Sequence, residues 1–271
     1  NPLENDSLES YRLVKIDMSR LTVEAVKEFG LSNKEALRSK NMWALGLVYW
    51  MYGRKRQASI DWLETKFAKN PDVAKANIAA LNAGHAFGET AEMPAELGTF
   101  DVEPAKIEPG LYRTITGAES VSLGLLAGSL LANLKIAFCS YPITPASSLL
   151  HQLARMKEFG VLTFQAEDEI AAAVAAIGAS YAGSLGITSS SGPGIALKME
   201  AIGLAIATEL PLVVINSQRA GPSTGMPTKT EQSDLYQAVY GRNGDAPMPV
   251  ISVSTPSDGY EVAIEAVRIA T

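Results

Sequence analysis

The 271-residue chain is 47% hydrophobic and 19% charged, a balance typical of a globular protein with a buried core, so disordered and fibrous classes are excluded. Its net charge of −6 argues against a nucleic-acid binder, because neutralising phosphates requires a basic face. The single cysteine, Cys139, cannot form an internal disulfide or hold an iron–sulfur cluster, and with two histidines it cannot build a zinc site. We expect a protein of the reducing cytoplasm.

The chain begins with Asn1 and stops at Thr271 inside an apolar helical pattern, so we expect a piece of a longer polypeptide. No signal peptide is visible. The longest apolar stretch, residues 121–138, is interrupted by polar and glycine residues. It therefore predicts a helix leading into a buried strand rather than a membrane span.

Residues 1–92 predict a mainly helical, partial domain. Apolar residues recur at three-to-four spacing in residues 23–29, 41–50, 60–67 and 73–83, with Ser32 or Asn33 and Asn70 placed as caps. A basic cluster at Arg54–Arg56 follows one of these helices, where cations normally complement the helix dipole. Residues 93–115 contain three prolines and few periodic apolar residues, which predicts a linker.

Residues 116–271 predict an α/β domain with a doubly wound, mostly parallel sheet, because short apolar strands alternate with alanine-rich helices. The predicted strands are residues 135–139, 161–165, 185–189, 212–216 and 250–253. The predicted helices are residues 119–133, 146–157, 167–181, 194–208, 231–239 and 259–270.

Each of the first four predicted strands is followed by a polar turn with a residue capable of chemistry. Because the carboxyl ends of parallel strands meet in one crevice, these turns should converge. Glu167 follows the second strand and opens an apolar helix, so we expect its carboxylate at the edge of a buried layer; the helix dipole alone explains its neighbours Asp168 and Glu169. Arg219 follows the fourth strand and is suited to bidentate capture of a carboxylate or phosphate, although a surface arginine bonded to loop carbonyls is an equal alternative.

The serine-rich turn at residues 189–194 has two possible roles. It could cradle a phosphate at a helix start, which would suit a noncatalytic nucleotide-binding or assembly module. It lacks the GxGxxG pattern, since Leu197 stands at the third glycine, and it lacks the Walker lysine. We favour a tight helix entry beside a ligand.

Four segments together resemble the alpha subunit of 2-oxoacid:ferredoxin oxidoreductases. These are YPITP at residues 141–145, QAEDE at 165–169, SSSGPG at 189–194 and QRAGPSTGMPTKTEQSDL at 218–235. The resemblance covers residues 116–271 and implies the family's pyrimidine-binding domain, whereas residues 1–92 are similar to the end of its gamma domain. The GMPTKTEQSDL sequence and the gamma-like region ahead of it are most similar to the 2-oxoglutarate enzymes. Pyruvate and branched-chain 2-oxoacid enzymes are the alternatives.

The resemblance also implies roles for individual residues. Glu167 matches the glutamate that bonds N1′ of thiamine diphosphate and so promotes loss of the thiazolium proton. The resemblance also implies that Pro142 and Ile143 contact this cofactor. Thr144, Arg219 and Thr228 match positions that hold the 2-oxoacid, with Arg219 on its carboxylate.

The family's remaining components are expected outside this chain. Neither a GDG motif for Mg²⁺ nor a set of cysteines for [4Fe–4S] clusters is present, so the resemblance places both in a beta subunit. It further implies ferredoxin as electron acceptor, coenzyme A as co-substrate and an alpha–beta dimer of dimers. The chain should be inactive alone.

Overall fold

The computed structural model describes residues 4–11, 13–90 and 99–271, which form two compact units, Asn1–Pro109 and Gly110–Thr271. The start of the predicted linker, residues 93–98, lies outside the described residues. Residues 99–115 contain neither helix nor strand. Among the described residues, every helix is too short or too polar to span a lipid bilayer.

The first unit is helical, as predicted. Its helices are α1 (Met18–Ala25), α2 (Asn33–Ala36), α3 (Lys40–Met51), α4 (Gln57–Lys66) and α5 (Pro71–Glu89), with 3₁₀ turns at Asp6–Leu8, Lys27–Phe29 and Leu37–Ser39. Helix α1 begins earlier than predicted because the Asp17 side chain caps it, accepting a 3.0 Å hydrogen bond from the Arg20 amide. Ser32 caps α2 as expected, and Trp43 is an almost fully buried member of the core.

The second unit confirms the predicted α/β class. Its strands are β1 (Ile136–Ser140), β2 (Leu162–Gln165), β3 (Leu185–Ser190) and β4 (Leu212–Asn216), all parallel in the order β2-β1-β3-β4. Its helices are α6 (Gly117–Leu131), α7 (Ser147–Leu153), α8 (Glu169–Tyr181), α9 (Gly192–Leu197), α10 (Met199–Ala207), α11 (Leu235–Tyr240) and α12 (Asp258–Ala270), with a 3₁₀ turn at Lys157–Phe159.

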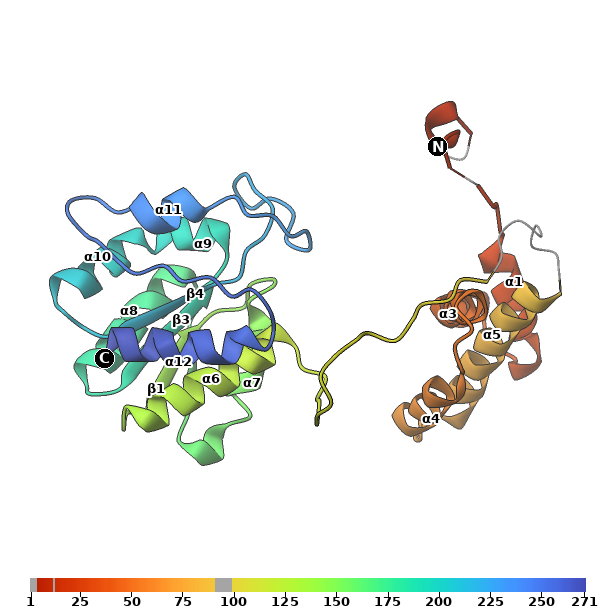
Figure 1. Cartoon of the computed structure of the whole chain (residues 1–271), viewed down its shortest axis with the longest axis horizontal. Helices are drawn as coiled ribbons and strands as arrows, with labels where there is room; N and C mark the ends of the chain where they lie inside the picture. The colour runs from red at the N-terminus through yellow and green to blue at the C-terminus, as the bar shows by residue number, and fades with distance from the viewer. Residues whose placement is uncertain (1–3, 12, 91–98) are drawn as a thin grey trace. The chain divides into compact units, whose positions relative to one another are not determined.

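Helices cover both faces of this sheet (Figure 1). Helices α6, α7 and α12 pack on one face and α8 to α10 on the other. Strand β1 and strand β3 are buried along their whole length, and their serines and Thr188 at the carboxyl ends are buried with the apolar residues. The chain leaves β1 toward β2 on one side and returns to β3 on the other, so the switch point of the sheet lies between β1 and β3.

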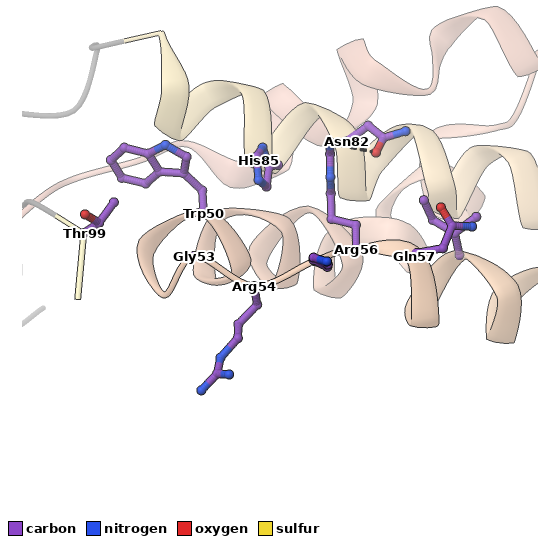
Figure 2. A pocket seen from close by; sticks show the side chains of 10 residues that line it. Trp50, Gly53, Arg54, Arg56, Gln57, Asn82, His85 and Thr99 are labelled. Atoms are coloured by element: carbon purple, nitrogen blue, oxygen red, sulfur yellow. Dashed lines mark hydrogen bonds between the residues drawn. The ribbon is translucent and has the colours of Figure 1, made fainter. Parts of the chain in front are cut away.

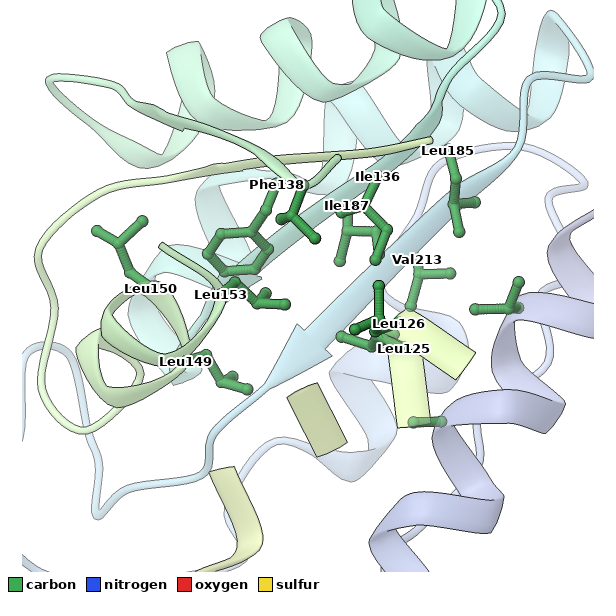
Figure 3. Close-up of a cluster of buried hydrophobic side chains, with 13 residues drawn as sticks. Leu125, Leu126, Ile136, Phe138, Leu149, Leu150, Leu153, Leu185, Ile187 and Val213 are labelled. Carbon is green, nitrogen blue, oxygen red and sulfur yellow. The ribbon is translucent and has the colours of Figure 1, made fainter. Parts of the chain in front are cut away.

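The main core joins the sheet to α6, α7 and α12 (Figure 3). Phe138, Ile187 and Leu153 have no exposed surface, and Leu125 and Val267 are almost fully buried. On the opposite face, α8 presents the alanines Ala172, Ala173 and Ala176, also without exposed surface. Their small side chains let α8 lie close to β1 and β3.

This close contact favours glycine at position 186 of β3. A Cβ at this position would overlap the Ala176 carbonyl of α8 and the Ser180 hydroxyl, which accepts a 2.9 Å hydrogen bond from the Gly186 amide. We expect Gly186→Ala to lower the free energy of unfolding by about 1–3 kcal/mol, the usual cost of overpacking. Urea unfolding measures this, with Gly178→Ala in α8 as control, since nothing lies within 4 Å of its added Cβ. Equal stability of the two variants would contradict the packing argument.

One predicted strand is wrong. Residues 250–253 contain no strand, although Val250, Ile251 and Val253 are apolar, and they stay 41–45% exposed. A strand needs a neighbour's backbone groups at ladder spacing, and this segment does not pair with β4 among the described residues. Instead the Val253 side chain lies beside Gly259 in the first turn of α12.

The predicted helices differ from the observed ones in their boundaries; the predicted helix 146–157, for example, ends at Leu153 as α7. The predicted helix 194–208 is two helices, α9 and α10, separated at Lys198. Helix α11 begins after Asp234 rather than at residue 231, and the Asp234 carboxylate is bonded to Asn216 at the end of β4 and to Gln218. Helix α8 begins at Glu169 rather than at Glu167, because Asp168 is its N-cap and accepts a 2.8 Å hydrogen bond from the Ala171 amide.

Candidate functional site at the carboxyl ends of the strands

Two pairs of hydroxyl groups join β1 to β3 at the switch point. The Ser140 and Ser189 Oγ atoms are 2.8 Å apart, and the Tyr141 hydroxyl is 2.9 Å from Ser190 Oγ. All four residues are buried. Burial raises the pKa of Tyr141, the Ser190 bond lowers it and Glu169 raises it, so this hydroxyl stays protonated and can donate.

Gly194 in α9 is required beside this pair. A Cβ there would overlap both Ser190 Oγ and the Tyr141 hydroxyl, so only glycine lets the helix approach them. The tight turn at residues 189–194 is therefore a helix entry, the favoured alternative. Ser189, Ser190 and Ser191 have no exposed surface, which leaves no serine hydroxyl available to a phosphate from solvent.

The YPITP turn after β1 has a rigid backbone. The Ile143 amide donates to Ser147 Oγ at 3.0 Å, and that hydroxyl lies 3.1 Å from the Ile143 carbonyl. The Ile143 side chain packs against Tyr141 and Ala166. Pro142 and Thr144 are exposed, so this turn presents their side chains to solvent at the edge of the sheet.

Arg219 connects this turn to the loop after β4. Its Nη1 donates to the Thr144 carbonyl at 2.8 Å, and the side chain is 7% exposed. The Nε atom is buried without a hydrogen-bond partner. A guanidinium held on one side by a backbone carbonyl, with a donor left over, suits capture of an anionic oxygen.

The loop that follows returns to Arg219. The Ala220 amide donates to the Lys229 carbonyl at 2.9 Å. The Ala220 carbonyl accepts a hydrogen bond from the Met226 amide at 3.1 Å. Thr228 lies in the turn closed by these bonds and is exposed. The backbone therefore brings Thr228 back to the strand end that carries Arg219.

Glu167 leaves the sheet next to the YPITP turn. Ser140 pairs with Gln165 in the β1–β2 ladder, and the Ala166 amide donates to the Ser140 carbonyl at 2.8 Å. Glu167 follows at once and is exposed in this chain, contrary to the expected edge of a buried layer. The reason is that β2 is an edge strand, so the described residues provide no layer beyond it.

A cavity of about 640 Å³ adjoins Arg219 on the β4 side. Gly192, Ala220 and Asp234 are among its lining residues. The buried Asp234 carboxylate accepts hydrogen bonds from Asn216 Nδ2 at 2.7 Å and Gln218 Nε2 at 3.1 Å. These bonds fix the carboxylate near Gly192 at the start of α9, and Arg219 both lines this cavity and bonds the YPITP turn.

Lys198 is a residue of this region that sequence reasoning missed. It has no exposed surface, and its Nζ donates to Thr188 Oγ1 at 2.7 Å and to the Ser189 carbonyl at 2.9 Å. Burial lowers the pKa of Lys198 to about 8, and the Glu169 charge acts in the opposite direction. The available signal was a single lysine within an otherwise apolar stretch, residues 195–199.

Cys139 takes no part in the site. The thiol is buried in β1, and burial raises its pKa to about 11. It is therefore protonated at neutral pH and poorly suited as a nucleophile or metal ligand. Within the described part of the chain, no group of three histidine, cysteine or acidic side chains could hold a metal ion.

A second cavity, of about 720 Å³, lies in the first unit beside the basic cluster at residues 54–56 (Figure 2). Arg56 turns inward and donates to Asn82 Oδ1 at 2.9 Å, whereas Arg54 points away from Trp50 and His85. His85 Nδ1 lies 3.3 Å from Glu89 Oε1 but makes no well-aligned hydrogen bond. These cations do not converge on one point, so the cavity lacks the features of an anion site.

Comparison with known proteins assigns the second unit to a family. Residues 128–271 match the family described as "Pyruvate flavodoxin/ferredoxin oxidoreductase, thiamine diP-bdg". The chain belongs to this family. The resemblance seen in the four turn segments is confirmed, and the parallel sheet with its flanking helices is the thiamine-diphosphate-binding domain of these oxidoreductases.

Two members of the family show how much of this chain and of their own length is shared. A 2-oxoglutarate oxidoreductase subunit KorA of Mycobacterium tuberculosis is 52% identical over 100% of this chain and 41% of its own length. A 2-oxoglutarate synthase subunit KorA of Archaeoglobus fulgidus is 47% identical over 49% of this chain and 39% of its own length. The chain thus spans about two fifths of these relatives.

A solved structure has the same fold. It is the 2-oxoglutarate:ferredoxin oxidoreductase from Magnetococcus marinus with 2-oxoglutarate, coenzyme A and succinyl-CoA bound, and it is 35% identical with a TM-score of 0.73. The match covers 92% of this chain and 41% of that chain.

Proposed function

We propose that the chain is part of the alpha subunit of a 2-oxoglutarate:ferredoxin oxidoreductase, which carries out oxidative decarboxylation dependent on coenzyme A. In this proposal residues 1–92 are the end of a gamma-like domain, residues 93–115 a linker and residues 116–271 the pyrimidine-binding domain. The observation that carries it is the buried Arg219 guanidinium, bonded to the Thr144 carbonyl with its Nε atom unpartnered. The names of the similar proteins support 2-oxoglutarate as substrate.

The ends of β1 and β2 fit the aminopyrimidine of thiamine diphosphate. Glu167 offers an exposed carboxylate directly after β2, and Ile143 supplies an apolar surface from the adjacent turn, with Pro142 beside it. Glu167 would accept the hydrogen bond of the ring N1′ and hold a proton there. Thiamine diphosphate, when bound, supplies the carbanion that adds to the 2-oxo carbon.

Arg219 would bind the carboxylate of the 2-oxoacid beside the cofactor. Its Nη1 bond to Thr144 holds the guanidinium, and its Nε is left without a hydrogen-bond partner. Thr144 and Thr228, both exposed on turns at the same edge of the sheet, would add hydroxyl donors to the substrate oxygens.

The rest of the reaction would need components beyond these residues. We assign Mg²⁺ and the [4Fe–4S] cluster to a beta subunit, because the single buried Cys139 cannot supply the thiolates of a cluster. Ferredoxin would accept the electrons and coenzyme A the acyl group, in a cytoplasmic alpha–beta dimer of dimers. The subunit designations of the similar proteins support a partner.

A substrate comparison tests the proposal. The alpha chain is produced with its beta partner, and reduction of ferredoxin dependent on coenzyme A is measured with 2-oxoglutarate, pyruvate and a branched-chain 2-oxoacid. We expect kcat/KM to be about tenfold or more higher for 2-oxoglutarate, since a second carboxylate can make further charged hydrogen bonds. A preference for pyruvate or the branched-chain acid would transfer the assignment to those enzymes, and no turnover with any of the three would refute it.

A further inference from the structure

Lys198 lies where α9 and α10 meet: it is the C-cap of α9 and the N-cap of α10. It is 0% exposed, which is rare for a lysine because the ammonium loses its water. Two hydrogen bonds replace that water, from Nζ to Thr188 Oγ1 at 2.7 Å and to the Ser189 carbonyl at 2.9 Å. The Tyr141 ring centroid is 5.6 Å from Nζ, within reach of a cation–π contact.

Ser189 connects this ammonium to the site. Its Oγ is 2.8 Å from Ser140 Oγ, and the Ser140 carbonyl accepts the Ala166 amide at 2.8 Å, one residue before Glu167. Ser140 also leads directly into Tyr141 and the YPITP turn. The contacts of Lys198 therefore reach the backbone beside Glu167 and the turn that carries Thr144.

Few charged groups of the described residues act on Lys198. Glu169 at the start of α8 acts on both Lys198 and Tyr141, and Arg219 acts on Tyr141 from the loop after β4. Glu200 of α10 is exposed. A methionine at position 198 would fill a similar volume but leave Thr188 Oγ1 and the Ser189 carbonyl without their donor.

We propose that Lys198 is a positioning residue for the 2-oxoacid reaction: through Ser189 and Ser140, its ammonium holds residues 141–145 and the backbone next to Glu167 in their working arrangement. This inference rests on the proposed function. Packing alone would not need a charge at this position, because an apolar side chain fills such a space without desolvating an ammonium.

The test uses the enzyme assembled with its beta partner and compares Lys198→Met with Lys135→Met. Lys135 is exposed and precedes β1 at the opposite end of the sheet, so the control makes the same chemical change away from the site. Thr188→Val, which keeps the lysine and removes one acceptor, is the second variant.

Hydrogen exchange followed by mass spectrometry reports on the positioning itself. In Lys198→Met and Thr188→Val, we expect the peptide covering residues 140–145 to exchange about tenfold faster, because its local opening becomes easier. In Lys135→Met it should exchange as in the wild type.

Steady-state kinetics measure the effect of this positioning on turnover. We expect kcat of Lys198→Met to fall about tenfold or more, with a smaller change in KM for the 2-oxoacid. Because Lys198 loses its proton near pH 8, the wild type and Lys135→Met should also lose kcat as pH rises through that value. Lys198→Met should lack this limb of the pH profile, which a loss of stability alone would not remove.

The outcomes separate the two proposals. Unchanged exchange in Lys198→Met and Thr188→Val overturns the positioning role, and so does faster exchange with an unchanged kcat. If Lys198→Met does not fold, Thr188→Val decides by the same two measurements. If the wild type turns over none of the 2-oxoacids, the proposed function fails, while the exchange rate of residues 140–145 still decides whether Lys198 holds this turn.

Discussion

The Glu167→Gln variant of the assembled enzyme is expected to lose roughly 10²–10⁴-fold in kcat, the usual contribution of an acid–base group. Glutamine keeps the shape of the side chain but cannot hold the proton that the carboxylate exchanges with the aminopyrimidine. Folding should be unaffected, because Glu167 is exposed and the N-cap of α8 is Asp168. Steady-state turnover and thermal unfolding of the same preparation measure the two effects.

Glu158→Gln is the matched control. Glu158 is also exposed, but it lies in the Lys157–Phe159 turn ahead of β2, at the other end of the strand that leads to Glu167. Its variant should have the activity of the wild type. Near-normal kcat in Glu167→Gln would remove this carboxylate from the mechanism, and a large loss in both variants would point to assembly rather than chemistry.

Arg219→Ala should raise KM for the 2-oxoacid by roughly 10- to 100-fold, since a hydrogen bond to a charged group contributes about 1.5–3 kcal/mol. The change in kcat should be smaller, because the carboxylate is bound in both the ground state and the transition state. Arg219→Lys keeps the charge but not the planar fork and should recover only part of the loss. Initial rates over a range of 2-oxoglutarate concentrations measure both constants.

Arg155→Ala, at an exposed position after α7, controls for the loss of a positive charge and should leave KM unchanged. Arg219 also supports the YPITP turn through the Thr144 carbonyl, so unfolding of each variant is followed in parallel. An unchanged KM in Arg219→Ala would refute the carboxylate role. A fall in kcat alone would instead assign Arg219 to support of the turn.

The sheet was predictable because each of the four observed strands begins with apolar residues and leads into a polar turn, and this information is local. The same reasoning failed for residues 250–253, where an apolar run lacks a partner. Composition shows that a segment can be buried but not whether a neighbouring strand offers its backbone groups at the right spacing. The start of α8 was wrong for a related reason, since three consecutive acids can each serve as a cap and only the backbone shows that Asp168 does.

The sequence by itself determined the fold class, the family and which turns carry polar chemistry, because each depends on residues close together in the chain. Only the tertiary structure decided the partners: Tyr141 with Ser190, Ser140 with Ser189, and Arg219 with the Thr144 carbonyl. It also showed that Lys198 points inward to the end of β3. Such pairs depend on strand order, register and the packing of helices on the sheet, which bring together residues that are far apart in sequence.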